Sequence, residues 1–166
     1  MTLPGGTAGT ADAAAVVRAA SAAGLTLATA ESLTAGMVAA ELGTVPGVSA
    51  VLAGGVVAYS NAVKHKALGV DAELLAAAGS VDAEVARQMA DGVRRALEAD
   101  VAVSTTGVAG PEPHDGKPVG CVFIAVVSAE RTLVEEYLFL GDRAAIRRQT
   151  RDEALLLLAR VLSDRP

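Results

Sequence analysis

A serine stands where a β-prone segment gives way to a helix-prone one. Residues 25–30 (LTLATA) alternate apolar and threonine side chains as a strand does, and the stretch from Ser32 to Leu42 favours a helix. Ligands of α/β sheets tend to bind at such a junction, where the amides at the helix start could stabilise a developing oxyanion. Ser32 is therefore a candidate nucleophile, although a serine at this position is also a common helix N-cap.

A second segment, GGVVAYSNAVKHK (54–66), could supply the base that a serine nucleophile needs. It places a phenol (Tyr59), a carboxamide (Asn61) and an amine (Lys64) just after a β-prone stretch. A lysine that is desolvated beside the serine can stay neutral enough to accept its proton. His65 is a rival base with a suitable ordinary pKa. The basic run also fits a solvated helix face, so the residues alone leave the three interpretations open.

Two further segments could bind a ligand. A Gly/Pro-rich loop, STTGVAGPEPHDGKPVG (104–120), follows a predicted strand and is either a binding rim or a simple turn. Downstream, Arg143, Arg147 and Arg151 are four residues apart and share one helix face. Cations near a helix N-terminus oppose the macrodipole, so either a bound anion such as phosphate or neighbouring carboxylates must compensate them.

The elements that would position these residues alternate along the chain. We predict five strands, near residues 25–30, 49–59, 101–106, 119–129 and 132–140. A Gly54–Gly55 pair is expected to interrupt the second strand with a bulge or break. We predict helices at 11–23, ended by Gly24, at 32–42, 61–68 and 71–78, and after capping residues Asp82 and Asp142.

Strands that alternate with helices imply parallel pairing, while the late hairpin implies an antiparallel part. The predicted fold is therefore α/β, a mixed sheet with helices on both faces. Residues 1–10 are expected to form a flexible tail and residues 11–166 a single domain.

Composition narrows the function classes. The 166 residues carry a net charge of -5, two Tyr, two Phe and no Trp, so the basic surface and stacking rings of nucleic-acid binders are lacking. The single cysteine excludes an internal disulfide, and two histidines are too few for a recognisable metal site. We expect no membrane span and no secretion signal, with the cytoplasm as the default location. Two-fold assembly is the commonest choice, so we expect a homo-oligomer.

Three common signatures are absent or broken. Pro118 follows Lys117 where a phosphate loop needs Ser or Thr, and the glycine spacing before it is wrong. No GxGxxG follows the first strand. Tyr59 and Lys64 are one residue too far apart for the Tyr-x-x-x-Lys of short-chain oxidoreductases.

Four stretches occur in one order: AESLTAG, GGVVAYSNAVKHKALGV, TTGVAGP…GKPVG and GDRAAIRRQT. Together they resemble the carboxy-terminal domain of the competence/damage-inducible CinA family, whose stand-alone members are nicotinamide-nucleotide amidohydrolases. The resemblance covers residues from about 10 to 163. It implies a three-layer α/β/α sandwich that converts nicotinamide mononucleotide to nicotinic acid mononucleotide and ammonia, without a metal or an organic cofactor.

The resemblance also implies roles for individual residues. Ser32 matches the nucleophile and Lys64 its partner base, with Tyr59 alongside as the third catalytic residue. Lys64 must be neutral to act, which predicts a depressed pKa. The alternative hypothesis is a catalytically silent module of the same fold, which binds the nucleotide without hydrolysing it or serves a regulatory role. The residues expected to bind substrate are Glu31, Thr34, Gly36, Gly55, Asn61, Thr106, Gly107, Arg143, Arg147 and Arg148.

Overall fold

A five-stranded mixed sheet forms the centre of the computed structural model, which describes residues 12–164. The strand order is β2-β1-β3-β4-β5. β1 pairs in parallel with β2 and β3, whereas β4 pairs antiparallel with β3 and β5. The strands are β1 (Leu27–Glu31), β2 (Leu52–Val57), β3 (Val101–Gly107), β4 (Cys121–Ser128) and β5 (Thr132–Leu138).

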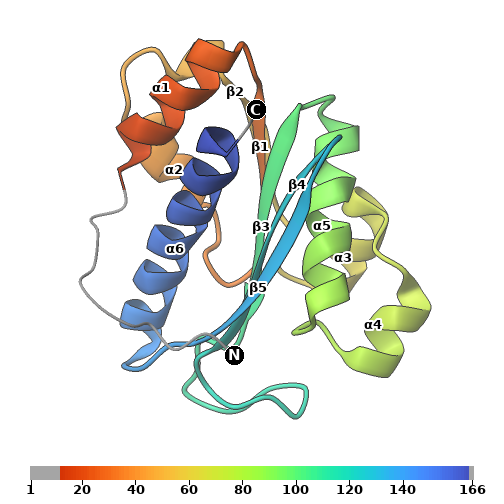
Figure 1. The fold of residues 1–166 in the computed structure, drawn as a ribbon. Coiled ribbons are helices and arrows are strands. Elements are labelled where there is room, and N and C mark those ends of the chain that lie inside the picture. Colours follow the sequence, from red (N-terminus) through yellow and green to blue (C-terminus); the bar gives the residue numbers. More distant parts are fainter. Residues whose placement is uncertain (1–11, 165–166) are drawn as a thin grey trace.

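Helices cover both faces of this sheet, which confirms the predicted α/β/α sandwich (Figure 1). One face carries α1 (Ala13–Ala23), α2 (Met37–Gly43) and α6 (Arg143–Ser163), and the other carries α3 (Asn61–Leu68), α4 (Ala72–Ala78) and α5 (Ala83–Ala96). A short 3-10 turn, η1 (Val48–Ala50), precedes β2. The tail predicted for residues 1–10 lies outside the described residues.

The predicted capping residues fix the helix ends. Asp82 accepts hydrogen bonds from the amides of Glu84 and Val85 at the start of α5, and Asp142 accepts one from Ala145 at the start of α6. Gly24 adopts the left-handed conformation that ends α1. The structure thus confirms the predicted starts of α5 and α6 and the predicted end of α1, whereas α1 begins at Ala13 and not at residue 11.

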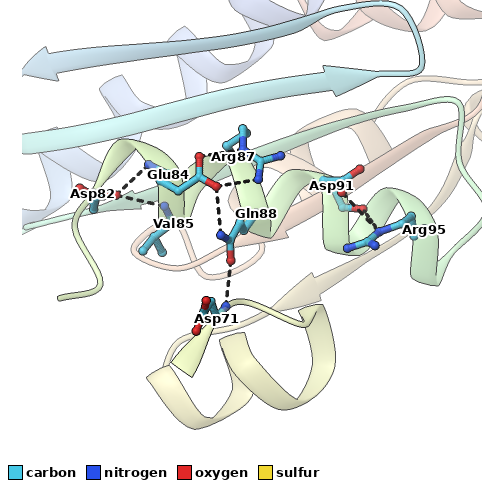
Figure 2. Close-up of polar contacts among 8 residues, drawn as sticks. All are labelled: Asp71, Asp82, Glu84, Val85, Arg87, Gln88, Asp91 and Arg95. Carbon is cyan, nitrogen blue, oxygen red and sulfur yellow. Dashed lines mark hydrogen bonds and ion pairs between the residues drawn. The ribbon is translucent and has the colours of Figure 1, made fainter. Parts of the chain in front are cut away.

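Polar contacts also connect α5 to the segment before α4 (Figure 2). Glu84 accepts from Arg87 and from Gln88, and the Gln88 side-chain oxygen accepts from the Asp71 amide at 2.8 Å. α5 also contacts α3. A side chain at Gly92 of α5 would collide with the Leu68 carbonyl at the end of α3. α3 therefore packs closely on α5. This close packing fixes the position of α3, which carries Lys64, relative to α5.

Two predicted elements differ from the structure. α2 begins at Met37, because residues 32–36 form a turn and not the first helical turn. β2 is shorter than predicted and runs through Gly54 and Gly55 without a break. The predicted irregularity is present one residue earlier, where the pairing shifts from Leu27–Leu52 to Ala28–Gly54.

Candidate active site

Ser32 lies in a tight turn directly after β1. Its amide donates to the Thr105 carbonyl of β3 at 3.0 Å, and its carbonyl accepts from the Ala35 amide at 3.0 Å. The two central amides of this turn, those of Leu33 and Thr34, meet no backbone or side-chain acceptor within residues 12–164. The Ser32 side chain is 8% exposed, so the turn presents a nearly buried hydroxyl next to two free donors.

Glu31, predicted to bind substrate, instead holds this turn in place. It is 1% exposed, and its carboxylate accepts from the amides of Val38 and Ala39 at 2.9 and 3.0 Å. It also accepts from the Thr34 hydroxyl at 2.6 Å. The amides of Val38 and Ala39 at the observed start of α2 are therefore already bonded to Glu31, which leaves the amides of the Ser32 turn for an oxyanion.

Thr34, also predicted to bind substrate, directs its side chain to partners within the protein. It is fully buried, and its hydroxyl lies 2.8 Å from that of Thr105. Because the single Thr34 proton goes to Glu31, the Thr105 hydroxyl is the donor in this second bond. A chain of hydrogen bonds thus joins β3 to the Ser32 turn and to the start of α2.

Glu31→Gln is expected to destabilise the fold by about 2–3 kcal/mol. Both carboxylate oxygens accept hydrogen bonds, and in glutamine an NH2 group replaces one of them and faces a donor. The matched control is Glu41→Gln on α2, whose carboxylate makes a half-exposed ion pair with Arg151, and it should cost less than about 1 kcal/mol. Urea denaturation of both variants measures the difference. Equal losses would show that Glu31 does not brace the turn.

Lys64 reaches Ser32 from α3. The Nζ atom is 3.0 Å from Ser32 Oγ, 2.9 Å from the Ala58 carbonyl and 3.2 Å from the Tyr59 carbonyl. The side chain is 0% exposed. A neutral amine in this position donates its two protons to the carbonyls and turns its lone pair toward the Ser32 hydroxyl. This is the geometry that a general base requires.

Burial lowers the pKa of Lys64 from 10.5 to about 8, while the negative charge of Asp115 acts in the opposite direction. At pH 7 about one amine in ten is then neutral, compared with about one in three thousand for an unshifted lysine. The predicted depressed pKa is therefore present in the folded chain.

His65 does not compete for this position. Its Nδ1 atom lies 2.7 Å from the Val70 carbonyl, and the residue is exposed on α3. Lys66 is exposed as well, so the solvated helix face predicted for this run applies to these two residues and not to Lys64.

Tyr59 shares the cavity with Ser32 but faces a different partner. The residue is 53% exposed, and its hydroxyl accepts from Arg143 Nη2 at 2.6 Å. Its backbone carbonyl is one of the Lys64 acceptors. Within the described chain the phenol is not hydrogen-bonded to Ser32, so Tyr59 is placed to contact a ligand and to hold Lys64 through its backbone.

The cavity itself has a volume of about 320 Å³ and lies at the carboxyl ends of the parallel strands. The turn after β1, the segment before α3, the turn before α5, the loop after β3 and the start of α6 all contribute to it. The lining residues are Ser32, Leu33, Tyr59, Ser80, Gly107, Val108, Ala109, Gly110, Pro111, Glu112, Pro113, His114 and Arg143.

The arginines of α6 separate into different roles. Arg143 lines the cavity and also donates to the Gly110 carbonyl at 2.7 Å. Arg147 donates to the carbonyls of Leu33 and Thr34 and so braces the Ser32 turn from outside the cavity. Arg148 is exposed and does not line the cavity, whereas Arg151 pairs with Glu41 and Asp152. Among the described arginines, only Arg143 is placed to meet a bound anion there.

The remaining predicted site residues are mostly structural. Gly36 has φ +97° before α2, and a side chain at Gly55 would collide with the Thr29 hydroxyl of β1. Asn61 is exposed outside the cavity lining. Thr106 is buried and donates to the Ser80 carbonyl at 2.6 Å. Gly107 alone of these five lines the cavity.

Sequence reasoning missed Ser80 and Asp115. Ser80 lines the cavity, and its amide and hydroxyl both donate to the Asp115 carboxylate. The Asp115–Gly116 pair is a turn signal that could have marked this point of the loop. Nothing in the local sequence pointed to the pairing with Ser80, which lies 35 positions away.

Other parts of the molecule offer less chemistry. A second hollow of about 270 Å³ lies at the opposite end of the sheet, beside Val101 and Ser128, and the Ser32–Lys64 pair is far from its lining. Among residues 12–164 no group of three or more His, Cys, Asp or Glu could hold a metal ion. In the same part of the chain, no helix is long and apolar enough to cross a bilayer.

The family model described as the CinA C-terminal domain matches residues 10–162. Among relatives, a competence-damage inducible protein of Desulforamulus reducens is 50% identical over 133 residues, which are 80% of this chain and 32% of that protein. A CinA-like protein of Anaeromyxobacter dehalogenans is 53% identical over 129 residues, 77% of this chain and 32% of that protein. The chain thus spans about a third of the length of these curated relatives.

Solved structures agree in fold over nearly the whole length. The competence damage-inducible protein A of Klebsiella pneumoniae has a TM-score of 0.89 at 34% identity, covering 93% of this chain and 96% of that one. The competence/damage inducible protein of Agrobacterium tumefaciens has a TM-score of 0.87 at 36% identity, covering 92% and 93%. On the family match and these likenesses, the chain belongs to the CinA C-terminal domain family.

Proposed function

We propose that this domain is an amidohydrolase that converts nicotinamide mononucleotide to nicotinic acid mononucleotide and ammonia. The observation that carries the proposal is the 3.0 Å contact between Lys64 Nζ and Ser32 Oγ beside a ligand-sized cavity. A structural lysine would ordinarily keep its charge in water or pair it with a carboxylate. A fully buried amine that hydrogen-bonds a serine hydroxyl and two carbonyls suits a base instead.

The first half of the reaction forms an ester. Neutral Lys64 takes the proton of the Ser32 hydroxyl while Oγ bonds to the carboxamide carbon. The backbone amide of Leu33, a residue that lines the cavity, is the proposed donor to the resulting tetrahedral oxyanion, and one such donor typically contributes about 3 kcal/mol. The C–N bond then breaks, and protonated Lys64 gives its proton to the departing nitrogen, which leaves as ammonia.

Water completes the cycle. Lys64, neutral again, takes a proton from a water molecule whose oxygen bonds to the ester carbon. The bond from that carbon to Ser32 Oγ breaks, and the proton returns to the serine. The products are the nucleotide carboxylic acid and free enzyme, so one water is consumed for each ammonia released.

Arg143 is the proposed partner of the 5′-phosphate. Arg143→Ala should raise KM for nicotinamide mononucleotide by about tenfold with a smaller change in kcat, because a contact made equally in ground and transition states affects binding. Steady-state kinetics of this variant and of Arg18→Ala, an exposed arginine on α1, measure the effect. A rise in KM for Arg148→Ala in place of Arg143→Ala would put the phosphate on the outer face of α6.

The whole proposal is tested by mixing the protein with nicotinamide mononucleotide and following both ammonia and the nucleotide acid. We expect the two products in equal amounts. Binding by calorimetry without either product would favour the alternative, a silent nucleotide-binding module.

A further inference from the structure

We propose that Asp115 is a positioning residue that ties the loop after β3 to the turn before α5, at the edge of the cavity that holds Ser32. Its effects on the loop and on Lys64 do not depend on the proposed function. The chemistry of the Ser32–Lys64 pair does not itself use this carboxylate, but the three residues before it, 112–114, line the cavity.

The tie consists of two short hydrogen bonds to one residue. Asp115 Oδ2 accepts from the Ser80 amide at 2.7 Å and from the Ser80 hydroxyl at 3.0 Å. The Ser80 carbonyl in turn accepts from Thr106 on β3. Ser80 therefore connects the turn before α5 to two other segments, the loop after β3 through Asp115 and strand β3 through Thr106.

The backbone around the tie is adapted to it. A side chain at Gly79 would come within 2.6 Å of the Asp115 carboxyl group, so only glycine leaves room there. Asp115 and Gly116 have φ values of +49° and +70° between the mutually hydrogen-bonded His114 and Lys117, the geometry of a type I′ turn. The turn fixes the Asp115 backbone, and Ser80 fixes its side chain.

The charge of Asp115 acts on the base. The hydrogen-bond partners of Lys64 Nζ are the Ser32 hydroxyl and the carbonyls of Ala58 and Tyr59, and all three groups are neutral. Burial lowers the pKa of Lys64, and the negative charge of Asp115 acts in the opposite direction and raises it.

Asp115 itself stays ionised at neutral pH. The Ser80 amide is the largest cause that holds the pKa of Asp115 below its usual value, with help from the Ser80 hydroxyl, His114 and Lys64 against partial burial. His114 Nε2 lies 3.4 Å from the carboxylate. The Asp115 carboxylate therefore anchors the loop to Ser80 and also opposes the lowering of the Lys64 pKa.

Two variants separate these effects. Asp115→Asn removes the charge but keeps an oxygen that can accept from Ser80. Asp115→Gly removes both, and glycine fits the positive φ, so the turn is kept. Glu73→Gln on α4 is the matched control, because it removes an exposed carboxylate that makes no bond to the cavity.

The charge is tested by NMR titration of Lys64 in protein labelled with ¹³C at the lysine ε carbon, with the signal assigned by its loss in Lys64→Met. We expect Asp115→Asn to lower the Lys64 midpoint by about half a pH unit or more, and Glu73→Gln by less than about 0.1 unit. A midpoint unchanged in Asp115→Asn would overturn the electrostatic role.

The tie is tested by hydrogen exchange of the Ser80 amide. Asp115→Gly should speed that exchange by at least about tenfold, and Asp115→Asn by much less. Unchanged exchange in Asp115→Gly would overturn the anchoring role. Neither experiment needs turnover, so a wild-type protein that releases no ammonia would end the proposed function and leave the assignment of Asp115 standing.

Discussion

Replacement of Ser32 by alanine is expected to lower kcat for ammonia release by at least about a thousandfold, because it removes the hydroxyl that Lys64 contacts and that forms the proposed ester. Affinity for nicotinamide mononucleotide should stay within about threefold, since the phosphate contact proposed at Arg143 is untouched. Kinetics and calorimetry on the same samples give both values.

The control for Ser32→Ala is Ser49→Ala, which removes an exposed hydroxyl in η1. Its kcat should equal that of the wild type. If Ser32→Ala kept more than a tenth of the wild-type rate, water would be attacking the amide directly and the serine would not be the nucleophile.

Lys64→Met is expected to have an effect of similar size. The variant keeps the unbranched apolar stem of the side chain and removes the amine that accepts the Ser32 proton, so kcat should fall by at least about a thousandfold. His65→Ala should be mild, because that imidazole is bound to the Val70 carbonyl outside the cavity. A severe His65→Ala and an active Lys64→Met would reverse the assignment of the base.

The wild-type pH profile follows from the lowered pKa of Lys64, about 8. Below that value kcat/KM should rise about tenfold for each pH unit as the neutral amine becomes available, and above it the profile should level off. A profile that is flat from pH 6 to 9 would mean that no group with this pKa takes part.

The same lysine links stability to pH. Its pKa is about 8 in the folded chain and 10.5 when unfolded, so between these values the unfolded state binds more protons. The free energy of unfolding should therefore rise from pH 8 to 10.5 by about 3 kcal/mol relative to Lys64→Met. Denaturation of both proteins over this range checks the sign and requires no substrate.

Much of the fold could be predicted from local signals. The caps at Asp82 and Asp142, the helix end at Gly24 and the alternation of strands and helices depend on neighbouring residues, which sequence shows directly. The partnership of Ser32 with Lys64 came from the family resemblance, because residue types alone left the rival base and the solvated face open.

The predicted site residues whose contacts are structural depend on packing between distant segments. Glu31 looks like a polar group beside a nucleophile, but its carboxylate caps a helix that begins at Met37. Gly55 looks like room for a substrate, but it makes room for Thr29 of the adjacent strand. Arg147 shares a helix face with Arg143, and only the position of the Ser32 turn decides which of them lines the cavity.

Covalent catalysis by Ser32 is tested most directly by trapping the acyl-enzyme with hydroxylamine. In the presence of nicotinamide mononucleotide, the ester should partition between water and hydroxylamine, giving the nucleotide hydroxamate in an amount that grows with hydroxylamine concentration. Ser32→Ala should give none. The wild type could instead release ammonia and form only the nucleotide acid, without hydroxamate, at every hydroxylamine concentration. That result would contradict an ester intermediate on this serine.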